Sequence, residues 1–180
     1  MSFSIDGKTA IVTGAANGIG LAVARHFTEC GANVMHADMD EASLVKELGS
    51  GAGDAEQKYF AGDLRENLTI ANLISATLDA YDRIDILVNA SRQVLESDFF
   101  DPEDRSVEIS LEQNVLTSLR LSQLVAKRMI KQSEGQHEGQ AGAIVNLSSI
   151  AARRATSSLL GYSISSAALD QMTRSMAVAL

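Results

Sequence analysis

The chain has 180 residues, of which 46% are apolar and 21% are charged, a composition typical of globular proteins rather than disordered ones. This length is enough for one domain with its own hydrophobic core, so we expect residues 1–180 to form a single domain. The net charge of -8 argues against a surface that binds nucleic acid or anionic membranes, because such surfaces need basic patches.

Cysteine content and the N-terminal sequence narrow the class of protein further. The single cysteine, Cys30, cannot form an internal disulfide, and no cluster of Cys and His residues has metal-ligand spacing, so no metal site is expected. The N-terminus lacks the apolar region of a signal peptide, and no apolar run approaches the roughly 18 residues that a membrane span needs. We therefore expect a cytoplasmic protein with no nucleic-acid and no membrane partner.

Short apolar runs, typical of strands, alternate along the chain with longer segments of helical periodicity. In chain order the predicted elements are strand 10–12, helix 18–29, strand 34–37, helix 40–48, strand 59–61, helix 68–81, strand 84–88, helix 106–131, loop 132–142, strand 144–147 and helix 159–180. The alternation predicts βαβ units, and near-continuous apolar strands indicate that helices cover both faces of the sheet. With right-handed crossovers, the fold class is α/β, a Rossmann-type doubly wound parallel sheet of strand order 3-2-1-4-5.

The last residues, Met176–Leu180, are apolar and contain no glycine, no capping residue and no basic side chain. A helix that stops there looks cut, and the fifth strand would be an unprotected edge of the sheet. The sequence therefore predicts either a fragment or a domain that depends on a partner.

A glycine-rich turn follows the first strand. Residues 13–20 read T-G-x-x-x-G-x-G, in which Gly14 allows a tight turn, Gly18 allows close approach to a pyrophosphate and Gly20 lets the helix pack on the strand. Asn17 and Ile19 complete the turn, and the helix that begins there offers amide donors to phosphates. A plain structural turn is the alternative, but the position between strand and helix favours dinucleotide binding.

An acidic residue ends the second strand. Asp38 lies about 20 residues past the glycine turn. A carboxylate at this position can accept hydrogen bonds from both ribose hydroxyls of NAD, and it would repel the 2′-phosphate of NADP. The alternative role, capping the following helix, suits Asp40 better by position. We expect NAD as cofactor in preference to NADP.

Further segments of the chain agree with one family. They are Asp63-Leu64, strand-end residues Asn89 and Ala90, Asn114 in a long helix, Ser149 after the fifth strand, and Tyr162, which lies 13 residues later. In this combination the chain resembles the short-chain dehydrogenase/reductase family, and within it the members similar to 3-oxoacyl-carrier-protein reductase. The resemblance extends over essentially the whole chain.

The resemblance implies hydride transfer between a nicotinamide cofactor and a small carbonyl or alcohol substrate. Tyr162 would be the general acid/base at the substrate oxygen, Ser149 would hydrogen-bond that oxygen, and Asn114 would hold a water in a proton relay. Asp63 and Leu64 would bracket the adenine, and Asn89 and Ala90 would lie along the cofactor. Taken singly, Tyr162, Ser149 and Asn114 each have an ordinary structural role as the better explanation, but together, at the spacing of the family, they favour the catalytic roles.

The chain departs from the family pattern at two positions. Ser166 stands where the family has the lysine that binds the nicotinamide ribose and lowers the tyrosine's pKa, and a serine supplies no charge. Arg92 replaces a glycine near the cofactor, where it either disturbs cofactor binding or contacts an anionic substrate. The Arg153–Arg154 pair could also contact an anionic substrate, and the alternative is that this pair is part of the solvated surface. We therefore expect Tyr162 to keep an ordinary pKa and the chain to bind cofactor better than it turns it over.

Three functions remain open. The chain is an NAD-dependent oxidoreductase, a catalytically silent nucleotide-binding or interaction module, or a piece of a working enzyme. The family has two further strands after the last helix, so the predicted fold is one with its C-terminal strands missing and an incomplete substrate site. The family also pairs subunits through its last two long helices. We therefore expect a homodimer or homotetramer through their apolar side chains, which are Leu116, Leu119, Leu124, Met129, Leu169, Met172 and Met176.

Overall fold

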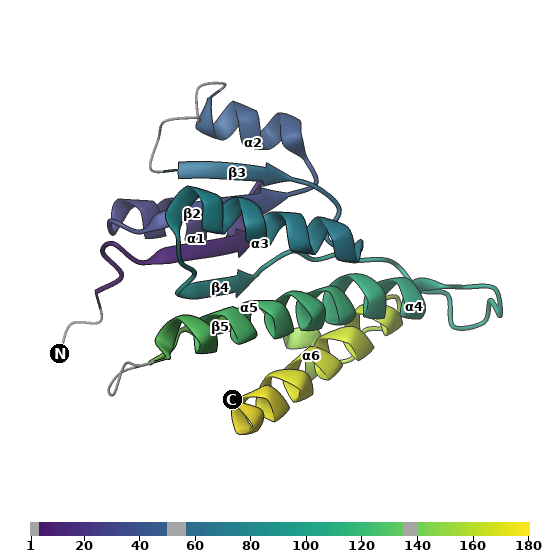
Figure 1. Ribbon diagram of the computed structural model, residues 1–180. Helices are drawn as coiled ribbons and strands as arrows, with labels where there is room; N and C mark the ends of the chain where they lie inside the picture. Colours follow the sequence, from purple (N-terminus) through teal and green to yellow (C-terminus); the bar gives the residue numbers. More distant parts are fainter. Residues whose placement is uncertain (1–3, 50–56, 135–139) are drawn as a thin grey trace. The chain divides into compact units, whose positions relative to one another are not determined.

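A computed structural model describes residues 4–49, 57–134 and 140–180 of the chain (Figure 1). They fall into two compact units, the first made of Met1–Ser91 and Ser122–Val145 and the second of Arg92–Leu121 and Asn146–Leu180. The expectation that the whole chain is one domain stays a prediction. No helix in the described ranges is long and apolar enough to span a membrane.

One five-stranded sheet carries the strands in the order β3-β2-β1-β4-β5, which confirms the predicted order and the α/β fold class. Its strands are β1 (Thr9–Thr13), β2 (Asn33–Asp38), β3 (Gln57–Ala61), β4 (Ile86–Asn89) and β5 (Ala143–Asn146). The pairs β1–β2, β1–β4 and β2–β3 are parallel, and Ile11 lies opposite Met35 on one side and Leu87 on the other. Parallel strands place their carboxyl ends at the same edge of a sheet, where α/β proteins bind ligands.

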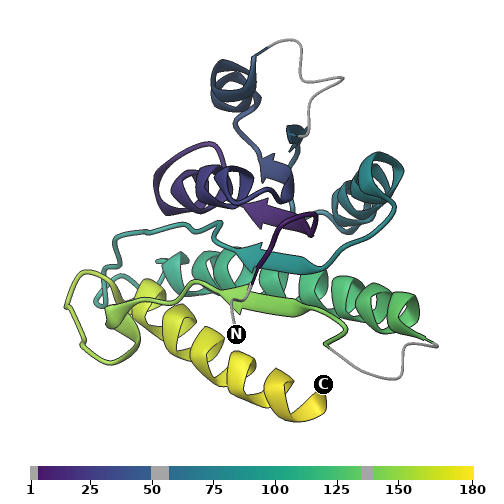
Figure 2. The ribbon, with the colours of Figure 1, turned by 90° about the vertical axis from the view of Figure 1, so that its left-hand side faces the viewer.

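Helices connect these strands. Those that lie wholly in the first unit are α1 (Gly18–Glu29), α2 (Glu41–Leu48) and α3 (Asn67–Tyr81). Figure 2 shows α1 and α3 on opposite faces of the sheet. Ala24 of α1 is fully buried against Ala10, Val12 and Val34 of the sheet, with Phe27 packed beside them. Small side chains at these positions let the helix lie close to the strands, and the apolar spacing along the helix predicts this contact.

The predicted single helix at 106–131 is wrong in its details. The segment consists of α4 (Ser106–Leu111), a π-helical turn η1 (Glu112–Leu116) and α5 (Thr117–Ser133). After β5 the chain forms the short 3-10 helix η2 (Ile150–Ala152) and the long helix α6 (Leu160–Ala179). A π turn inserts a residue into the ladder of helical hydrogen bonds, so apolar periodicity does not reveal it. The predicted loop also begins too early, because α5 continues to Ser133, and its residues 135–139 lie outside the described ranges.

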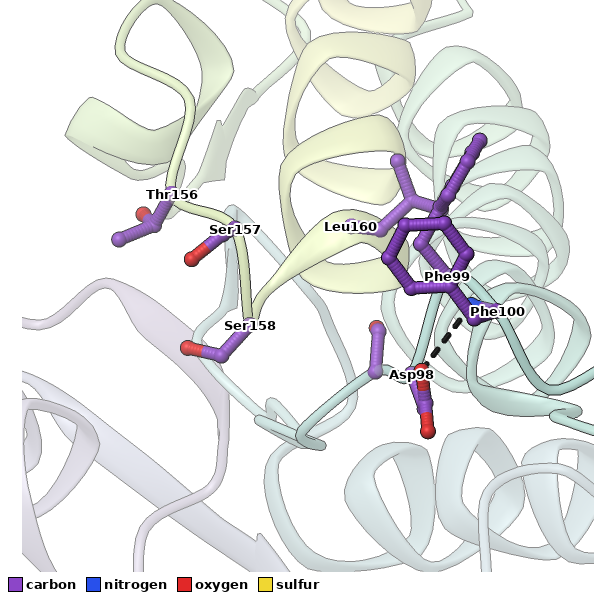
Figure 3. A pocket seen from close by; sticks show the side chains of 8 residues that line it. Asp98, Phe99, Phe100, Thr156, Ser157, Ser158 and Leu160 are labelled. Atoms are coloured by element: carbon purple, nitrogen blue, oxygen red, sulfur yellow. Dashed lines mark hydrogen bonds between the residues drawn. The ribbon is translucent and has the colours of Figure 1, made fainter.

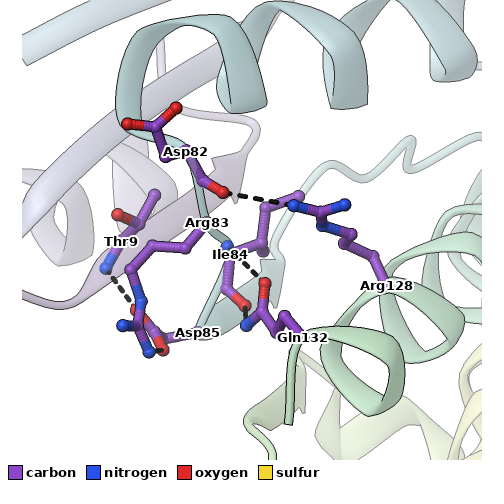
Figure 4. A network of polar contacts seen from close by, with 7 residues as sticks. All are labelled: Thr9, Asp82, Arg83, Ile84, Asp85, Arg128 and Gln132. Carbon is purple, nitrogen blue, oxygen red and sulfur yellow. Dashed lines mark hydrogen bonds and ion pairs between the residues drawn. The ribbon is translucent and has the colours of Figure 1, made fainter. Parts of the chain in front are cut away.

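The start of β4 is fixed by a polar network (Figure 4), and the strand begins at Ile86 rather than at residue 84. The Ile84 amide donates to Gln132 Oε1 at 3.2 Å, so this residue bonds to a helix side chain instead of a strand. The buried Asp85 carboxylate accepts from the Thr9 amide at 2.9 Å and from Arg83 Nε at 2.8 Å. Burial by itself raises the pKa of Asp85, but the hydrogen bonds of Arg83 and Thr9 outweigh it and hold that pKa below its usual value.

We expect Asp85→Asn to lower the free energy of unfolding at pH 7 by roughly 1–3 kcal/mol, the usual cost of losing a charged partner from buried donors. Because the folded-state pKa is depressed, the stabilisation is fully present above the unfolded pKa of about 3.9 and disappears as the pH falls through the folded value. Urea unfolding of both proteins at pH 7 and in acid measures this. The exposed Asp79→Asn variant is the matched control, and an unchanged midpoint for Asp85→Asn at pH 7 would contradict the prediction.

Candidate active site

β1 passes into α1 through the glycine-rich turn, and two of its glycines are required by backbone packing. Gly14 has a φ of +66°, and a Cβ there would lie 2.8 Å from the backbone nitrogen of Ser91 and 2.9 Å from the carbonyl of Ala90. A Cβ on Gly20 would overlap the carbonyl oxygen of Gly14. The first glycine therefore permits the turn, and the second lets the helix pack against it.

The outer side of this turn is open. Gly18 has a φ of +56°, and a Cβ added there would meet nothing within 4 Å. Asn17, Gly18 and Ile19 are exposed, and the N-cap residue Asn17 makes no side-chain capping hydrogen bond. The side chain of Asn17 therefore leaves the first amides of α1 uncapped, and helix N-termini of this kind suit an anionic group.

Asp38 lies beside this turn, half-buried at the end of β2. One carboxylate oxygen accepts from the Ala16 amide at 3.0 Å, and the other accepts from the Asp40 amide at 3.1 Å. The neighbouring Asp40 caps α2 by accepting from the Ser43 amide at 3.0 Å. Helix capping is thus the role of Asp40, and the two backbone bonds hold the carboxylate of Asp38 next to the glycine-rich turn.

The segment after β3 carries Asp63 and the buried Leu64. Arg65, which the sequence analysis did not single out, donates through Nε to both carboxylate oxygens of Asp63 at 2.9 Å. This hydrogen bonding is the main reason that the pKa of Asp63 lies below its usual value. Asp63 therefore stays charged, and part of its hydrogen-bonding capacity is already used by its neighbour.

The segment after β4 is tied to the end of β1. The Ala90 and Ser91 amides donate to Thr13 Oγ1 at 3.0 and 3.1 Å. The buried Asn89 donates through Nδ2 to Ser122 Oγ at 3.0 Å. Thr13 thus has a positioning role that the sequence analysis missed, although its place at the strand end is the signal that could have revealed it.

All ten predicted cofactor residues lie in the first unit. They lie at or just after the carboxyl ends of β1, β2, β3 and β4, the edge at which parallel sheets bind dinucleotides. The four predicted catalytic residues lie in the second unit. The sequence prediction therefore separates into two groups, each brought together within one unit.

Asn114 is buried in the π-helical turn. Its Oδ1 accepts from the Gln93 amide at 2.8 Å, and its Nδ2 donates to the Gln93 carbonyl at 2.9 Å and to Ser165 Oγ at 3.1 Å. The amide side chain thus joins the 92–97 segment to α6, the helix that carries Tyr162. A structural role is what these contacts show, and the predicted role in a water relay stays a prediction.

Tyr162, in the first turn of α6, is held by a cation. Arg92 Nη1 donates to the Tyr162 hydroxyl at 3.0 Å, and the guanidinium carbon lies 5.7 Å from the centre of the tyrosine ring. Burial by itself raises the pKa of Tyr162, but hydrogen bonding by Ser149 and Arg92 and the positive charge of Arg92 outweigh it. The pKa of Tyr162 therefore lies below its ordinary value of 10.

The two serines differ in their surroundings. Ser149 Oγ accepts from the Ala151 amide at 3.2 Å and caps η2. Its hydroxyl also hydrogen-bonds with Tyr162 and so lowers the pKa of that tyrosine. Ser166 is almost completely buried one helical turn after Tyr162, and its Oγ has no hydrogen-bond partner of ordinary geometry in the described part of the chain. Its effect on the pKa of Tyr162 is the weakest of those named, which fits that geometry.

An open depression of about 560 Å³ lies in the same unit (Figure 3). The side chains of Phe99 and Leu160 form its apolar wall, and Thr156, Ser157 and Ser158 form its polar wall. Phe99 and Phe100 contact each other edge to face, with 5.4 Å between ring centres, although both are largely exposed. Sequence reasoning missed this depression, because residues 97–100 and 156–160, which line it, lie far apart in the sequence.

Comparison with known proteins identifies the family. Residues 8–180 match the family described as short chain dehydrogenase. This chain belongs to the short-chain dehydrogenase family.

Among its relatives are two bacterial dehydrogenases. The NAD-dependent glycerol dehydrogenase of Listeria innocua is 30% identical over 176 residues, which cover 98% of this chain and 66% of the relative. The D-threitol dehydrogenase of Mycolicibacterium smegmatis is 31% identical over 163 residues, which cover 89% of this chain and 59% of the relative.

Solved structures of the family have the same fold. A short-chain dehydrogenase/reductase from Burkholderia phymatum in complex with NAD matches with a TM-score of 0.86 at 26% identity, over 99% of this chain and 62% of that one. A 7α-hydroxysteroid dehydrogenase complexed with NADH and 7-oxo glycochenodeoxycholic acid matches with a TM-score of 0.83 at 30% identity, over 97% of this chain and 66% of that one. This short-chain dehydrogenase thus spans about two thirds of the length of these relatives, and its similarity to 3-oxoacyl-carrier-protein reductases stays a prediction.

One expectation about the candidate active site is wrong. The loss of charge at Ser166 was expected to leave the pKa of Tyr162 at its ordinary value, but that pKa is lowered by a cation from another segment. Arg92, which stands where the family has a glycine, bonds through its guanidinium to the tyrosine hydroxyl. Arg153 and Arg154 are exposed, as a solvated pair would be.

Proposed function

We propose that the chain is an NAD(H)-dependent oxidoreductase that interconverts a small alcohol and the corresponding carbonyl compound. The observation that carries this proposal is the Tyr162 hydroxyl, which has a lowered pKa and hydrogen-bonding side chains around it. Perturbed titratable groups of this kind are typical of general acid/base sites. A silent nucleotide-binding module would have no use for such a tyrosine.

The residues of the first unit fit the cofactor. The open space over Gly18 and the uncapped amides of α1 suit the pyrophosphate, and the anchored carboxylate of Asp38 suits the ribose hydroxyls. The cofactor supplies hydride chemistry when it is bound. Asp63, Leu64, Asn89 and Ala90 would hold its adenine end and the middle of the dinucleotide.

The second unit would handle the proton. In reduction, Tyr162 gives its proton to the carbonyl oxygen of the substrate, and in oxidation its phenolate takes the proton from the alcohol. Ser149 donates a hydrogen bond to the same oxygen and orients it. Asn114 positions the π-helical turn against α6 through Ser165. The depression beside Phe99 and Leu160 is the proposed place of the substrate's apolar part.

The test is a calorimetric titration of the chain with NAD, followed by an assay with a panel of polyols, secondary alcohols and ketones. Relatives named for glycerol, threitol and a steroid substrate justify the breadth of the panel. NAD binding together with turnover of any alcohol supports the proposal. Absence of NAD binding at millimolar concentration contradicts it.

We propose NAD in preference to NADP because the carboxylate of Asp38 would repel a 2′-phosphate. Asp38→Asn keeps the acceptor for the Ala16 amide but removes the charge, so we expect the ratio of the NADP and NAD dissociation constants to fall roughly tenfold, about 1.4 kcal/mol. Calorimetry with both cofactors measures this ratio. Asp40→Asn, on the neighbouring helix cap, is the control that should leave it unchanged, and tighter NADP than NAD binding by the unaltered chain would reject the prediction.

We also propose that the chain forms a homodimer or homotetramer. Its cytoplasmic location remains a prediction. Two of the apolar residues first assigned to the interface, Met129 and Leu169, are buried in the fold, but Leu116 and Leu124 are exposed. Leu124→Glu should therefore at least halve the mass that light scattering measures at micromolar protein. Lys127→Glu on the same helix is the control for added negative charge, and a monomeric mass for the unaltered chain would rule out the association.

A further inference from the structure

Arg92 is the feature of the site that the family pattern does not explain. It stands in the segment after β4, 70 residues before Tyr162, and its Nη1 donates to the Tyr162 hydroxyl at 3.0 Å. The guanidinium carbon is 5.7 Å from the ring centre, so the cation lies near the ring as well as on its oxygen. A donor on this oxygen favours the phenolate over the phenol.

The charge of Arg92 is available to Tyr162. No carboxylate in the described ranges lies within ion-pair distance of this arginine. Its Nε and Nη2 atoms are buried and have no hydrogen-bond partner among the described residues, so the bond to the tyrosine is the one polar contact that the structure gives it. An arginine also keeps its proton throughout the pH range of enzymes.

We propose that Arg92 is a catalytic residue that takes the place of a lysine on α6 by stabilising the phenolate of Tyr162. This inference rests on the proposed oxidoreductase function. Ser166, one turn along α6, is neutral and buried, and the side chains that act on the tyrosine hydroxyl are those of Arg92, Ser149 and Ser166. Arg92 carries the charge among these three.

The proton balance follows from this assignment. In reduction the C=O π bond of the substrate breaks, a hydride supplied by the proposed NADH forms the new C–H bond, and Tyr162 supplies the proton of the new O–H bond, which leaves a phenolate beside Arg92. Arg92 stabilises that charge without giving up its own proton, because a guanidinium remains protonated. Solvent then returns a proton to Tyr162, and oxidation runs through the same states in reverse.

The decisive measurement is the pKa of Tyr162, obtained from the ultraviolet absorbance of phenolate during an alkaline titration of the free protein. The chain has three tyrosines, and subtraction of the Tyr162→Phe titration isolates the signal of Tyr162. Arg92→Gln should raise the pKa of Tyr162, and Arg92→Lys should restore much of the difference. Arg153→Gln, an exposed arginine of the same unit, is the matched control and should change nothing.

Kinetics give the second readout. At pH 7 the phenolate fraction falls about tenfold for each unit by which the pKa rises, so kcat for alcohol oxidation should fall by the same factor in Arg92→Gln while KM for NAD stays constant. Installing the lysine in Arg92→Gln/Ser166→Lys should recover the lost kcat.

A tyrosine pKa that is the same in folded Arg92→Gln and in the unaltered chain overturns the inference, even if activity is lost. If circular dichroism shows that Arg92→Gln does not fold, the Arg92→Lys variant decides. A Tyr162 pKa in Arg92→Lys that is no higher than in the unaltered chain supports a charge effect. A Tyr162 pKa that rises to the value of free tyrosine contradicts it. The titration uses neither cofactor nor turnover. A chain that binds no NAD but shows the pKa shift would therefore reject the proposed function and leave the arginine–tyrosine interaction in place.

Discussion

Tyr162→Phe is expected to lower kcat for alcohol oxidation by about 100- to 10,000-fold, the range that general acid/base catalysis contributes. Phenylalanine keeps the ring and its place on α6, but it removes the hydroxyl that Arg92 and Ser149 contact. The dissociation constant for NAD should be unchanged, because the cofactor residues lie in the first unit.

The pH profile distinguishes this role from a packing role. Oxidation uses the phenolate, so kcat of the unaltered chain should rise with pH and level off at the folded pKa of Tyr162, which lies below 10. The residual kcat of Tyr162→Phe should lack this rise with pH. Tyr81→Phe is the control, because the pKa of Tyr81 is raised to about 12 and this tyrosine plays no part in the site. A Tyr162→Phe variant with the pH profile of the unaltered chain would exclude the tyrosine as the acid/base.

The second large effect concerns Gly18. We expect Gly18→Val to weaken NAD binding by at least 100-fold, about 2.7 kcal/mol, because the new side chain would fill the open space over the glycine turn. That space is free of protein atoms within 4 Å, so the substitution meets a bound group rather than the fold.

Gly7 is a matched control for this substitution. Its φ of +68° is close to the +56° of Gly18, and a Cβ there also meets nothing within 4 Å. Gly7→Val should therefore carry a similar backbone strain of roughly 1–2 kcal/mol but leave NAD binding intact. Calorimetry of binding and thermal unfolding of both variants separate the two effects. Equal NAD affinity of the two variants would show that the turn does not hold the pyrophosphate.

Local chemistry explains how much of the site the sequence could predict. Gly14 and Gly18 adopt positive φ in a turn between a strand and a helix, and such requirements are encoded within a few neighbouring residues. Asp38 lies at the end of β2 as expected, because a strand end follows from the local apolar pattern, and its role toward the cofactor stays a prediction. The strand order also followed from local patterns, since alternating strands and helices with right-handed crossovers allow few topologies.

The tertiary structure decided that the guanidinium of Arg92 contacts the hydroxyl of Tyr162. Ser149 and Ser166 lie near it in sequence and were predicted as neighbours, whereas Arg92 comes from a segment 70 residues away. A hydrogen bond over such a separation depends on how the π-helical turn, held by Asn114, joins the 92–97 segment to α6. Neither residue periodicity nor spacing encodes that packing, because it results from the sum of many contacts in the folded unit. The local sequence therefore predicted the fold class, while the folded chain brought the cation of Arg92 to the tyrosine hydroxyl.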